Sequence, residues 1–342
     1  MEGKKCVGIL TSGGDAPGMN AAIRAVTRAA IYNGFDVKGI MRGYKGLITD
    51  EIIPFQTQNV SNIIQQGGTI LKTARCEEFR TPEGRKIAYD NIIKHGISAL
   101  VVIGGDGSLT GARIFASEYN FPIVGVPGTI DNDLFGTDHC PGYASAAKYI
   151  ATSMMEVYQD AHVYDTGMIV VMEIMGRHAG WLTAASALAG LHGAGPDLIY
   201  LPEGSFSFDR FLSDVSRVCA ENNNKCVVVV SEGIRFADGR YVGEFGIEET
   251  DRFGHAQMGG VCNVLKQLVR DKLGIKVRAI EFSLMQRCAA HIASDTDIEE
   301  AFAAGTAAVR YAVKGETGKM VSIERVADDP YRVVYGAAPL SI

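Results

Sequence analysis

An apolar run, Ala99-Leu-Val-Val-Ile103, is followed directly by the small and acidic residues Gly104-Gly-Asp-Gly-Ser108. Further along the chain a second apolar run, Ile123-Val-Gly-Val126, ends in Pro127-Gly-Thr-Ile-Asp-Asn-Asp133. Short runs of branched apolar residues are typical of strands that are buried on both faces of a parallel sheet. The loops that follow such strands lie at one edge of the sheet, where open α/β folds bind ligands. We therefore expect both loops in one site that combines glycine backbone, hydroxyl groups and three carboxylates.

A third glycine-rich loop precedes these two in the chain. Thr11-Ser-Gly-Gly-Asp-Ala-Pro-Gly-Met-Asn20 lies between the apolar run Cys6-Val-Gly-Ile-Leu10 and a predicted helix. This layout favours anions, because the first N–H groups of a helix are free and its dipole attracts negative charge. Small residues let the backbone approach phosphate oxygens, while one aspartate can hold Mg²⁺ and another can accept the proton of an attacking hydroxyl. The three loops together predict phosphoryl transfer.

Two common classes of nucleotide-binding protein are disfavoured by the spacing of these glycines. The chain has no G-x-x-x-x-G-K-[ST] loop, and none of the three runs has the G-x-G-x-x-G spacing followed by a helix and a distal acid. P-loop NTPases and ordinary Rossmann oxidoreductases are therefore poor matches. A single glycine run after a strand can simply make a turn. Because three glycine-rich runs each follow a predicted strand, the interpretation that they only make turns is less favourable.

The composition limits the class of protein. The chain has 342 residues, 47% of them hydrophobic and 21% charged, which is enough for one large core or two modest ones. A net charge of −6 argues against nucleic acid or membrane as a partner. Seven cysteines without C-x-x-C spacing favour reduced thiols, and no apolar run approaches the roughly 18 residues of a membrane span. These features predict a cytoplasmic protein.

Strand and helix patterns alternate along most of the chain, which predicts parallel, right-handed βαβ units. Besides the strands already described, we expect strands at residues 36–41, 168–173, 198–201, 225–231 and 276–281. We expect helices at residues 21–32, 85–95, 109–118, 145–157, 180–189, 208–221, 255–272 and 298–313. Two short strands are expected after Lys314.

The order and spacing of several short motifs resemble the 6-phosphofructokinase family, from Lys5 to about Thr296. The matching motifs are Leu10-Thr-Ser-Gly-Gly-Asp-Ala-Pro-Gly-Met-Asn20, Gly67-Gly-Thr-Ile-Leu-Lys-Thr-Ala-Arg75, the two loops after residues 103 and 126, Glu173-Ile-Met-Gly-Arg177, Glu232 and Gln286-Arg287. The resemblance implies an α/β fold with two Rossmann-like three-layer α/β/α lobes, mainly parallel sheets and an active site in the cleft between them. It also implies phosphorylation of fructose 6-phosphate at O1.

The resemblance further implies the division of the chain and its assembly. The nucleotide lobe would comprise residues 1–140 and about 286–330, and the fructose 6-phosphate lobe would comprise about 141–285 and the C-terminal tail. Members of this family share active sites between subunits, so we expect a homotetramer or homodimer. Arg278 is the residue expected to cross that interface. Where allosteric bacterial members carry a substrate-phosphate arginine, this chain has Met168.

The donor is predicted from two glycines. Pyrophosphate-using members typically carry Asp where this chain has Gly107 and Lys where it has Gly128. A carboxylate at position 107 would crowd and repel the α-phosphate of a nucleotide. ATP with Mg²⁺ is therefore the expected donor. A pyrophosphate-dependent enzyme and a catalytically silent sensor of nucleotides or sugar phosphates remain as alternatives.

The resemblance assigns roles position by position. The catalytic positions are Asp131 as the general base, Thr129, Asp133 and Arg177. The donor positions are Gly13, Arg75, Cys76, Gly105, Asp106, Gly107, Ser108 and Gly111, with Asp106 as the Mg²⁺ ligand. The fructose 6-phosphate positions are Thr129, Ile130, Asp131, Met175, Gly176, Arg177, Glu232, Arg278, Leu284, Met285, Gln286 and Arg287. Arginines suit these sites because their planar guanidinium groups bind phosphate with two hydrogen bonds.

Overall fold

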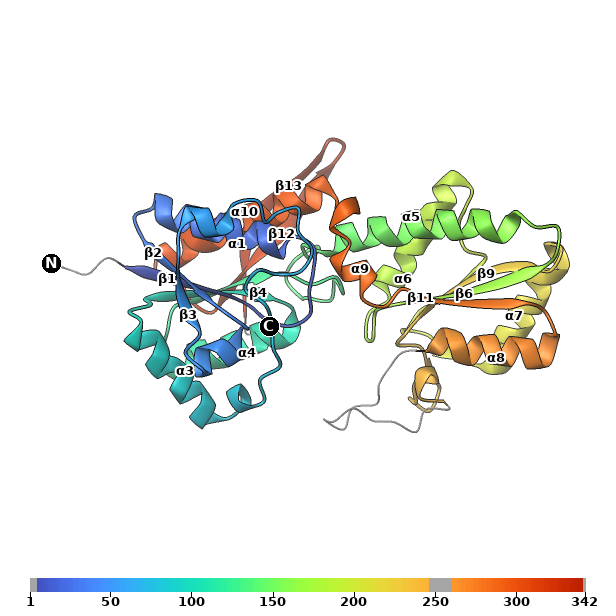
Figure 1. The fold of residues 1–342 in the computed structure, drawn as a ribbon, viewed down its shortest axis with the longest axis horizontal. Helices are drawn as coiled ribbons and strands as arrows, with labels where there is room; N and C mark the ends of the chain where they lie inside the picture. The colour runs from blue at the N-terminus through green and yellow to red at the C-terminus, as the bar shows by residue number, and fades with distance from the viewer. Residues whose placement is uncertain (1–4, 246–259, 341–342) are drawn as a thin grey trace. The chain divides into compact units, whose positions relative to one another are not determined.

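The computed structural model describes residues 5–245 and 260–340. The chain divides into two compact units (Figure 1). Unit 1 consists of Met1–Ser145 and Arg287–Ile342, and unit 2 is the continuous segment Ala146–Gln286. Both are mixed α/β structures with mainly parallel sheets, so the predicted fold class is confirmed.

Unit 1 is built around a seven-stranded sheet with the order β13-β12-β5-β4-β1-β2-β3. Its strands are β1 (Cys6–Thr11), β2 (Asp36–Ile40), β3 (Ile52–Phe55), β4 (Ala99–Gly104), β5 (Ile123–Pro127), β12 (Lys319–Asp328) and β13 (Tyr331–Pro339). All neighbours are parallel except β2 with β3 and β12 with β13. The central strands β1, β4 and β5 are fully buried, as their apolar sequences require.

Helices cover both faces of this sheet (Figure 1). They are α1 (Met19–Tyr32), α2 (Tyr44–Ile48), α3 (Pro82–Lys94), α4 (Asp106–Tyr119) and α10 (Asp295–Val313), with short 3₁₀ turns at Thr57–Val60, Glu78–Arg80 and Ala290–Ile292. Helices α1 and α10 lie side by side on one face, and α3 and α4 lie on the other. Helix α10 can approach α1 closely because a Cβ atom at Gly305 would come within 2.7 Å of the Ala22 carbonyl oxygen.

Unit 2 contains a parallel four-stranded sheet with the order β11-β6-β9-β7. Its strands are β6 (Met168–Ile174), β7 (Leu198–Tyr200), β9 (Lys225–Ser231) and β11 (Val277–Glu281), with a separate pair of β8 (Ser205–Phe206) and β10 (Arg235–Phe236). Its helical segments are α5 (Tyr143–His162), α6 (Trp181–Ala185), the 3₁₀ turns Ser186–His192 and Val242–Glu244, α7 (Phe208–Glu221), α8 (Val261–Leu273) and α9 (Met285–Cys288). Helices α5 and α9 each cross the boundary between the units. Helices α7 and α8 bury apolar side chains against β6 and β9 on one face of the sheet.

The C-terminal tail corrects one prediction. The residues beyond about 330 were assigned to the fructose 6-phosphate lobe, but their strand β13 belongs to unit 1. Strand β12 pairs in parallel with β5, through Lys319 with Val124 and Met320 with Gly125, and then turns into β13. Met320, Val321 and Ile323 are buried there because they complete the core beside β5. The two strands are ten and nine residues long, rather than short as predicted.

Other differences concern the ends of elements. The helix predicted at 180–189 is divided into α6 and a 3₁₀ turn that runs to His192. Of the helix predicted at 255–272, residues 255–259 lie outside the described part, and α8 begins at Val261. Edge strand β3 was missed because Pro54 interrupts its short apolar pattern. In the described part of the chain, no helix is long and apolar enough to cross a membrane.

Candidate active site

Three loops meet at the carboxyl edge of the sheet in unit 1, as the sequence predicts. Strands β5, β4 and β1 are neighbours and run parallel, so the segments that follow Pro127, Gly104 and Thr11 lie together. The Ser12 N–H donates to the Ile103 carbonyl oxygen over 3.0 Å, and the Gly128 N–H donates to the Gly104 carbonyl oxygen over 3.0 Å. These bonds extend the sheet into the loops and fix their starting points.

The loop after β4 is packed tightly against the loop after β1. A Cβ atom at Gly104 would lie 2.5 Å from the Ser12 carbonyl oxygen, so only glycine fits there. The space beside Gly13 is bounded by the buried Ser108 hydroxyl, and the space beside Gly105 is bounded by Thr129. Four of the residues predicted to bind the donor or the acceptor are thus brought together in unit 1.

The two glycines that predict the donor differ in their surroundings. A Cβ atom at Gly107 would meet nothing within 4 Å, so the first turn of α4 faces open space at this position. A Cβ atom at Gly128 would lie 3.1 Å from Cγ2 of Ile103 and 3.7 Å from Cε of Met19. Glycine at 128 therefore has a packing reason of its own. Of the two glycines, only Gly107 faces space that a nucleotide phosphate could use.

Asp106 is the first residue of α4 and is exposed. Among the described residues, no group of three or more His, Cys, Asp or Glu side chains could hold a metal ion. A single exposed carboxylate beside open backbone still fits Mg²⁺, which keeps several waters and is usually held by one or two carboxylates together with substrate phosphates. The donor set at Asp106 is therefore compatible with the predicted ion.

Asp131 lies in a loop that is closed by backbone hydrogen bonds. The Asp131 N–H donates to the Thr129 hydroxyl oxygen over 3.2 Å, and the Thr129 N–H donates to the Pro141 carbonyl oxygen over 3.1 Å. Asn132, with φ of 55°, accepts a hydrogen bond of 2.9 Å from the Cys140 N–H. Asp131 is half-buried, while Ile130 points into the core and Asp133 is exposed. The loop therefore presents one carboxylate in a defined backbone conformation.

Two further residues predicted to bind the donor, Cys76 and Gly111, lie against the core that contains the buried Tyr44. Tyr44 donates a 2.6 Å hydrogen bond to the Ser108 carbonyl oxygen, and a Cβ atom at Gly111 would lie 3.2 Å from its ring. Cys76 is half-buried, packs at the edge of the same core, and has its pKa raised by burial. Arg75, next to it, is exposed. Tyr44 was not predicted, since a buried tyrosine after a glycine carries no sequence pattern of its own.

Asn20 was also missed as a functional residue, although it ends the first quoted motif. It is 3% exposed. Its Nδ2 donates to the Gln66 carbonyl oxygen over 3.3 Å, and its Oδ1 accepts from the Ile70 N–H over 3.0 Å. Asn20 thereby fastens the Gly67–Arg75 segment to α1.

Asn20→Ala should destabilise unit 1 by about 1–3 kcal/mol, because it removes a buried side chain together with its two hydrogen bonds to the backbone of Gln66 and Ile70. Chemical denaturation would measure this change. Asn33→Ala is the matched control, because Asn33 lies at the end of the same helix and makes one exposed hydrogen bond to Ala29. We expect the control to change stability by less than about 0.5 kcal/mol. Equal stability of both variants would contradict the role of Asn20.

A second group of predicted residues comes together in unit 2, after β6 and β9. The Glu232 N–H donates to the Ile174 carbonyl oxygen over 2.8 Å, and the Glu232 carboxylate accepts from the Gly176 N–H over 3.2 Å. Gln286 accepts a 3.2 Å hydrogen bond from the Met175 N–H. A Cβ atom at position 233 would lie 2.2 Å from the Arg177 carbonyl oxygen, so glycine is required there. The segment Met175–Arg177 is thus held by residues from two other parts of the chain.

The structure places other predicted sugar-phosphate residues outside this group. Arg278 lies on edge strand β11 with an exposed side chain, and Leu284 and Met285 are both 58% exposed. Nη1 of Arg287 lies in unit 1, 3.5 Å from where a Cβ atom of Gly14 would be. Met168 is buried as the first residue of β6, so it offers no exposed substitute for the family arginine. The binding roles of these residues stay predictions.

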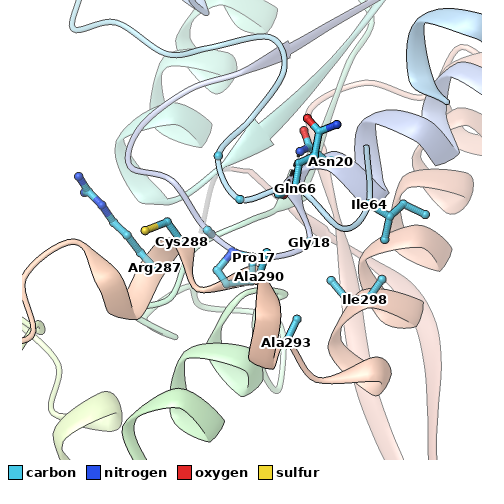
Figure 2. A pocket seen from close by; sticks show the side chains of 13 residues that line it. Pro17, Gly18, Asn20, Ile64, Gln66, Arg287, Cys288, Ala290, Ala293 and Ile298 are labelled. Carbon is cyan, nitrogen blue, oxygen red and sulfur yellow. Dashed lines mark hydrogen bonds between the residues drawn. The ribbon is translucent and has the colours of Figure 1, made fainter. Parts of the chain in front are cut away.

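One pocket in unit 1 adjoins the first glycine loop (Figure 2). It is lined by Ala16, Pro17, Gly18, Asn20, Ile64, Gln66, Gly67, Gly68, Arg287, Cys288, Ala290, Ala293 and Ile298. Only Arg287 among them was predicted to bind a ligand. Burial raises the pKa of Asp15, the residue before this lining, and the charge of Arg287 opposes that rise.

Both units of the chain fall within one known protein family. The sequence model of the Phosphofructokinase family matches residues 6–311. The chain belongs to the phosphofructokinase family. The match covers the three loops of unit 1, all of unit 2 and most of α10, so both groups of predicted residues lie within the phosphofructokinase region.

Similar phosphofructokinases differ in the donor that their names state. The ATP-dependent 6-phosphofructokinase 2 of Bacteroides thetaiotaomicron is 50% identical over 277 residues, which are 79% of this chain and 83% of the relative. The ATP-dependent 6-phosphofructokinase of Thermoanaerobacter sp. is 41% identical over 308 residues, which are 87% and 94% of the two chains. A crystal structure of the pyrophosphate-dependent phosphofructokinase of Nitrosospira multiformis superposes with a TM-score of 0.86 at 31% identity, covering 99% of this chain and 84% of that chain. The fold is therefore common to users of either donor.

Proposed function

We propose that this protein is an ATP-dependent 6-phosphofructokinase, which phosphorylates D-fructose 6-phosphate at O1 to fructose 1,6-bisphosphate. The observation that carries this proposal is the open space at Gly107, at the start of α4 and beside the exposed Asp106. A nucleotide needs such space for its α-phosphate. Relatives at 41–50% identity are named as ATP-dependent enzymes, whereas the pyrophosphate-dependent structural neighbour is 31% identical.

We assign the donor to unit 1. The backbone around Gly13, Gly105 and Ser108 would hold the phosphates, because tightly packed glycine loops expose N–H groups to phosphate oxygens. Arg75 would contribute permanent positive charge. Asp106 would hold Mg²⁺, which neutralises charge on the phosphate oxygens when it is bound.

We assign the acceptor to Asp131 and to the group after β6. Asp131 would accept the proton of the O1 hydroxyl, and Thr129 and Asp133 would support it within the same loop. In unit 2, the Met175–Arg177 segment and the Glu232 carboxylate would bind the sugar, because they are held together by hydrogen bonds. Arg177 would supply charge to phosphoryl oxygens with its guanidinium group.

Initial rates with fructose 6-phosphate and Mg²⁺ would test the proposal, with ATP compared with pyrophosphate. We expect the rate with ATP to exceed the rate with pyrophosphate at least a hundredfold. An equal or faster rate with pyrophosphate would mean that the donor is determined by residues other than Gly107. Binding of both substrates without turnover would instead support the sensor alternative.

We also propose self-association and a cytoplasmic location. Arg278 supports self-association, because its exposed side chain on edge strand β11 is available to a neighbouring subunit. Sedimentation of the purified protein, with Arg278→Ala assayed at several protein concentrations, would test this assignment. Activity that does not depend on protein concentration would contradict it.

A further inference from the structure

The loop that carries Asp131 is held both by hydrogen bonds within itself and by hydrogen bonds to β12. Its ends meet through the bond from Thr129 to Pro141, and its middle is joined by the bond from the Cys140 N–H to the Asn132 side chain. Its outer part pairs with β12: the Asp138 N–H donates to the Ile323 carbonyl oxygen over 2.9 Å. The Ile323 N–H in turn donates to the Thr137 hydroxyl oxygen over 2.9 Å.

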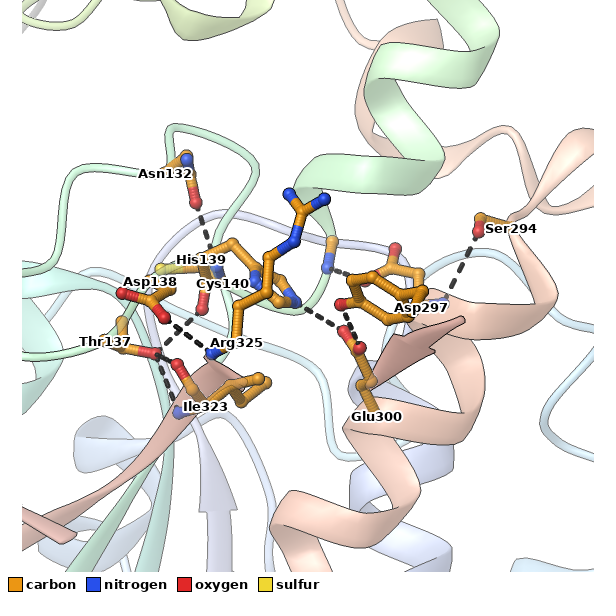
Figure 3. Close-up of polar contacts among 12 residues, drawn as sticks. Asn132, Thr137, Asp138, His139, Cys140, Ser294, Asp297, Glu300, Ile323 and Arg325 are labelled. Atoms are coloured by element: carbon orange, nitrogen blue, oxygen red, sulfur yellow. Dashed lines mark hydrogen bonds and ion pairs between the residues drawn. The ribbon is translucent and has the colours of Figure 1, made fainter. Parts of the chain in front are cut away.

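His139 ties this loop to helix α10 (Figure 3). Its Nε2 lies 2.5 Å from Oε2 of Glu300, and the Tyr331 hydroxyl donates to Oε1 of Glu300 over 2.5 Å. Glu300 is only 4% exposed. We call His139, Glu300 and Tyr331 the His139 clamp. It joins the Asp131 loop, α10 and β13 through one carboxylate.

A second buried carboxylate of α10 holds the end of the same loop. Asp297 is fully buried, and it accepts hydrogen bonds from the Gly142 N–H over 2.8 Å and from the N–H and hydroxyl of Ser145. These donors lie at the N-terminus of α5, whose free N–H groups need acceptors. Asp297 is therefore satisfied without His139, and the two carboxylates have separate partners.

The His139 clamp is needed for a physical reason. A carboxylate buried with one hydrogen bond from a neutral tyrosine would remain poorly compensated, and such groups strongly destabilise the conformation that buries them. An imidazole at 2.5 Å supplies a second donor and, when protonated, a positive charge. Without the imidazole, the loop segment next to Glu300 would favour conformations in which water reaches the carboxylate.

We propose that His139 and Glu300 are positioning residues that hold the loop carrying Asp131 in the conformation needed for phosphoryl transfer. The path from His139 to Asp131 is short. His139 precedes Cys140, whose N–H donates to the Asn132 side chain, and Asn132 directly follows Asp131 in the chain. Neither residue touches the substrate in this mechanism. The inference rests on the proposed function, because it takes Asp131 as the base.

The clamp depends on pH in a defined direction. The hydrogen bond to Glu300 raises the pKa of His139 above its usual value, and burial opposes this rise. The ionisable groups around the pair are Asp297 from α10, Asp138 from the loop, Tyr331 and Tyr335 from β13, and Arg325 from β12. Because the pKa is higher in the folded state, the contribution of His139 is complete below its unfolded pKa of about 6.5. It is lost as pH rises through the folded value.

The experiment compares His139→Leu, which removes the hydrogen bond and the charge, with His139→Gln, which keeps a donor to Glu300. We expect His139→Leu to lower kcat at least tenfold, with KM for both substrates changed less than threefold, and His139→Gln to recover most of kcat. The ratio of wild-type to His139→Gln turnover should fall as pH rises. His95→Gln is the matched control, because His95 Nε2 lies 2.6 Å from Asp50 in the same unit but away from the 129–142 loop. Its kcat should equal that of the wild type.

Amide hydrogen exchange at Cys140 gives a readout that needs no activity. We expect exchange there to be at least tenfold faster in His139→Leu than in the wild type or in His95→Gln. Unchanged exchange, or kcat within twofold of the wild type, would overturn the proposal. If the wild-type protein transfers no phosphoryl group from either donor, the proposed function fails, and exchange at Cys140 alone decides whether the clamp exists. If His139→Leu does not fold, Tyr331→Phe replaces it. This variant removes one hydrogen bond to Glu300 at a side chain that is 40% exposed. The expected change in kcat and in exchange at Cys140 is then at least threefold instead of tenfold.

Discussion

Asp131→Asn should lower kcat by a factor of about 10² to 10⁴, because an amide cannot accept the proton of the sugar hydroxyl. The variant should fold like the wild type, since the Asp131 side chain is half-buried and the bond from its N–H to Thr129 is kept. Fructose 6-phosphate and ATP should still bind, because the positive charges and backbone donors are unchanged. Single-turnover kinetics with calorimetric binding would separate the two effects.

Asp133→Asn is the comparison for this variant. It makes the same chemical change two residues away in the same loop, on an exposed side chain. We expect a smaller loss of kcat, because its carboxylate would support the charge of the site without accepting the proton. Undiminished turnover in Asp131→Asn would remove Asp131 from the role of base. Equal losses in both variants would assign the effect to the net charge of the loop.

Gly107→Asp should reduce kcat/KM for ATP by at least about a hundredfold. Two like charges about 4 Å apart near a protein surface repel by roughly 4 kcal/mol at an effective dielectric constant of 20, and each 1.4 kcal/mol corresponds to a factor of ten. The new side chain would enter space that is open within 4 Å, so the fold should tolerate it. Steady-state rates at varied ATP and at varied pyrophosphate would measure the change for each donor.

Gly107→Asn separates charge from volume, because its side chain has nearly the size of aspartate and no charge. We expect it to lose much less ATP activity than Gly107→Asp, and the difference should shrink as salt concentration rises. Similar losses in the two variants would show that position 107 acts through volume. Unchanged ATP kinetics in Gly107→Asp would mean that the α-phosphate does not bind near α4.

Much of the fold was predictable because several elements carry strong local patterns. Helix α7 and strand β9 begin and end at the predicted residues, since Ser207 caps the helix and the run Lys225–Ser231 is almost wholly apolar. Strands β4 and β5 are buried on both faces, and their continuous branched apolar sequences indicate this. The meeting of the three loops followed from the rule that parallel strands end at one edge.

The parts that could not be predicted depend on contacts between distant segments. The partner of β12 is β5, nearly two hundred residues earlier, and nothing local in residues 319–328 identifies that partner. The roles of Asn20 and Tyr44 come from hydrogen bonds to Gln66, Ile70 and Ser108, which pattern analysis does not reveal. The packing of Gly128 against Ile103 was likewise not predictable from the sequence, and it gives this glycine a structural role that is independent of the donor.

The insertion of unit 2 between the two segments of unit 1 sets an order for folding during synthesis. Residues 146–286 leave the ribosome as one continuous stretch, so unit 2 can fold before residues 287–342 have been made. Unit 1 must wait for these residues, because α10 covers α1 and β12 covers the open edge of β5. Until then, the edge of β5 that β12 covers has no strand partner, and an unpaired strand edge is a site at which chains can associate.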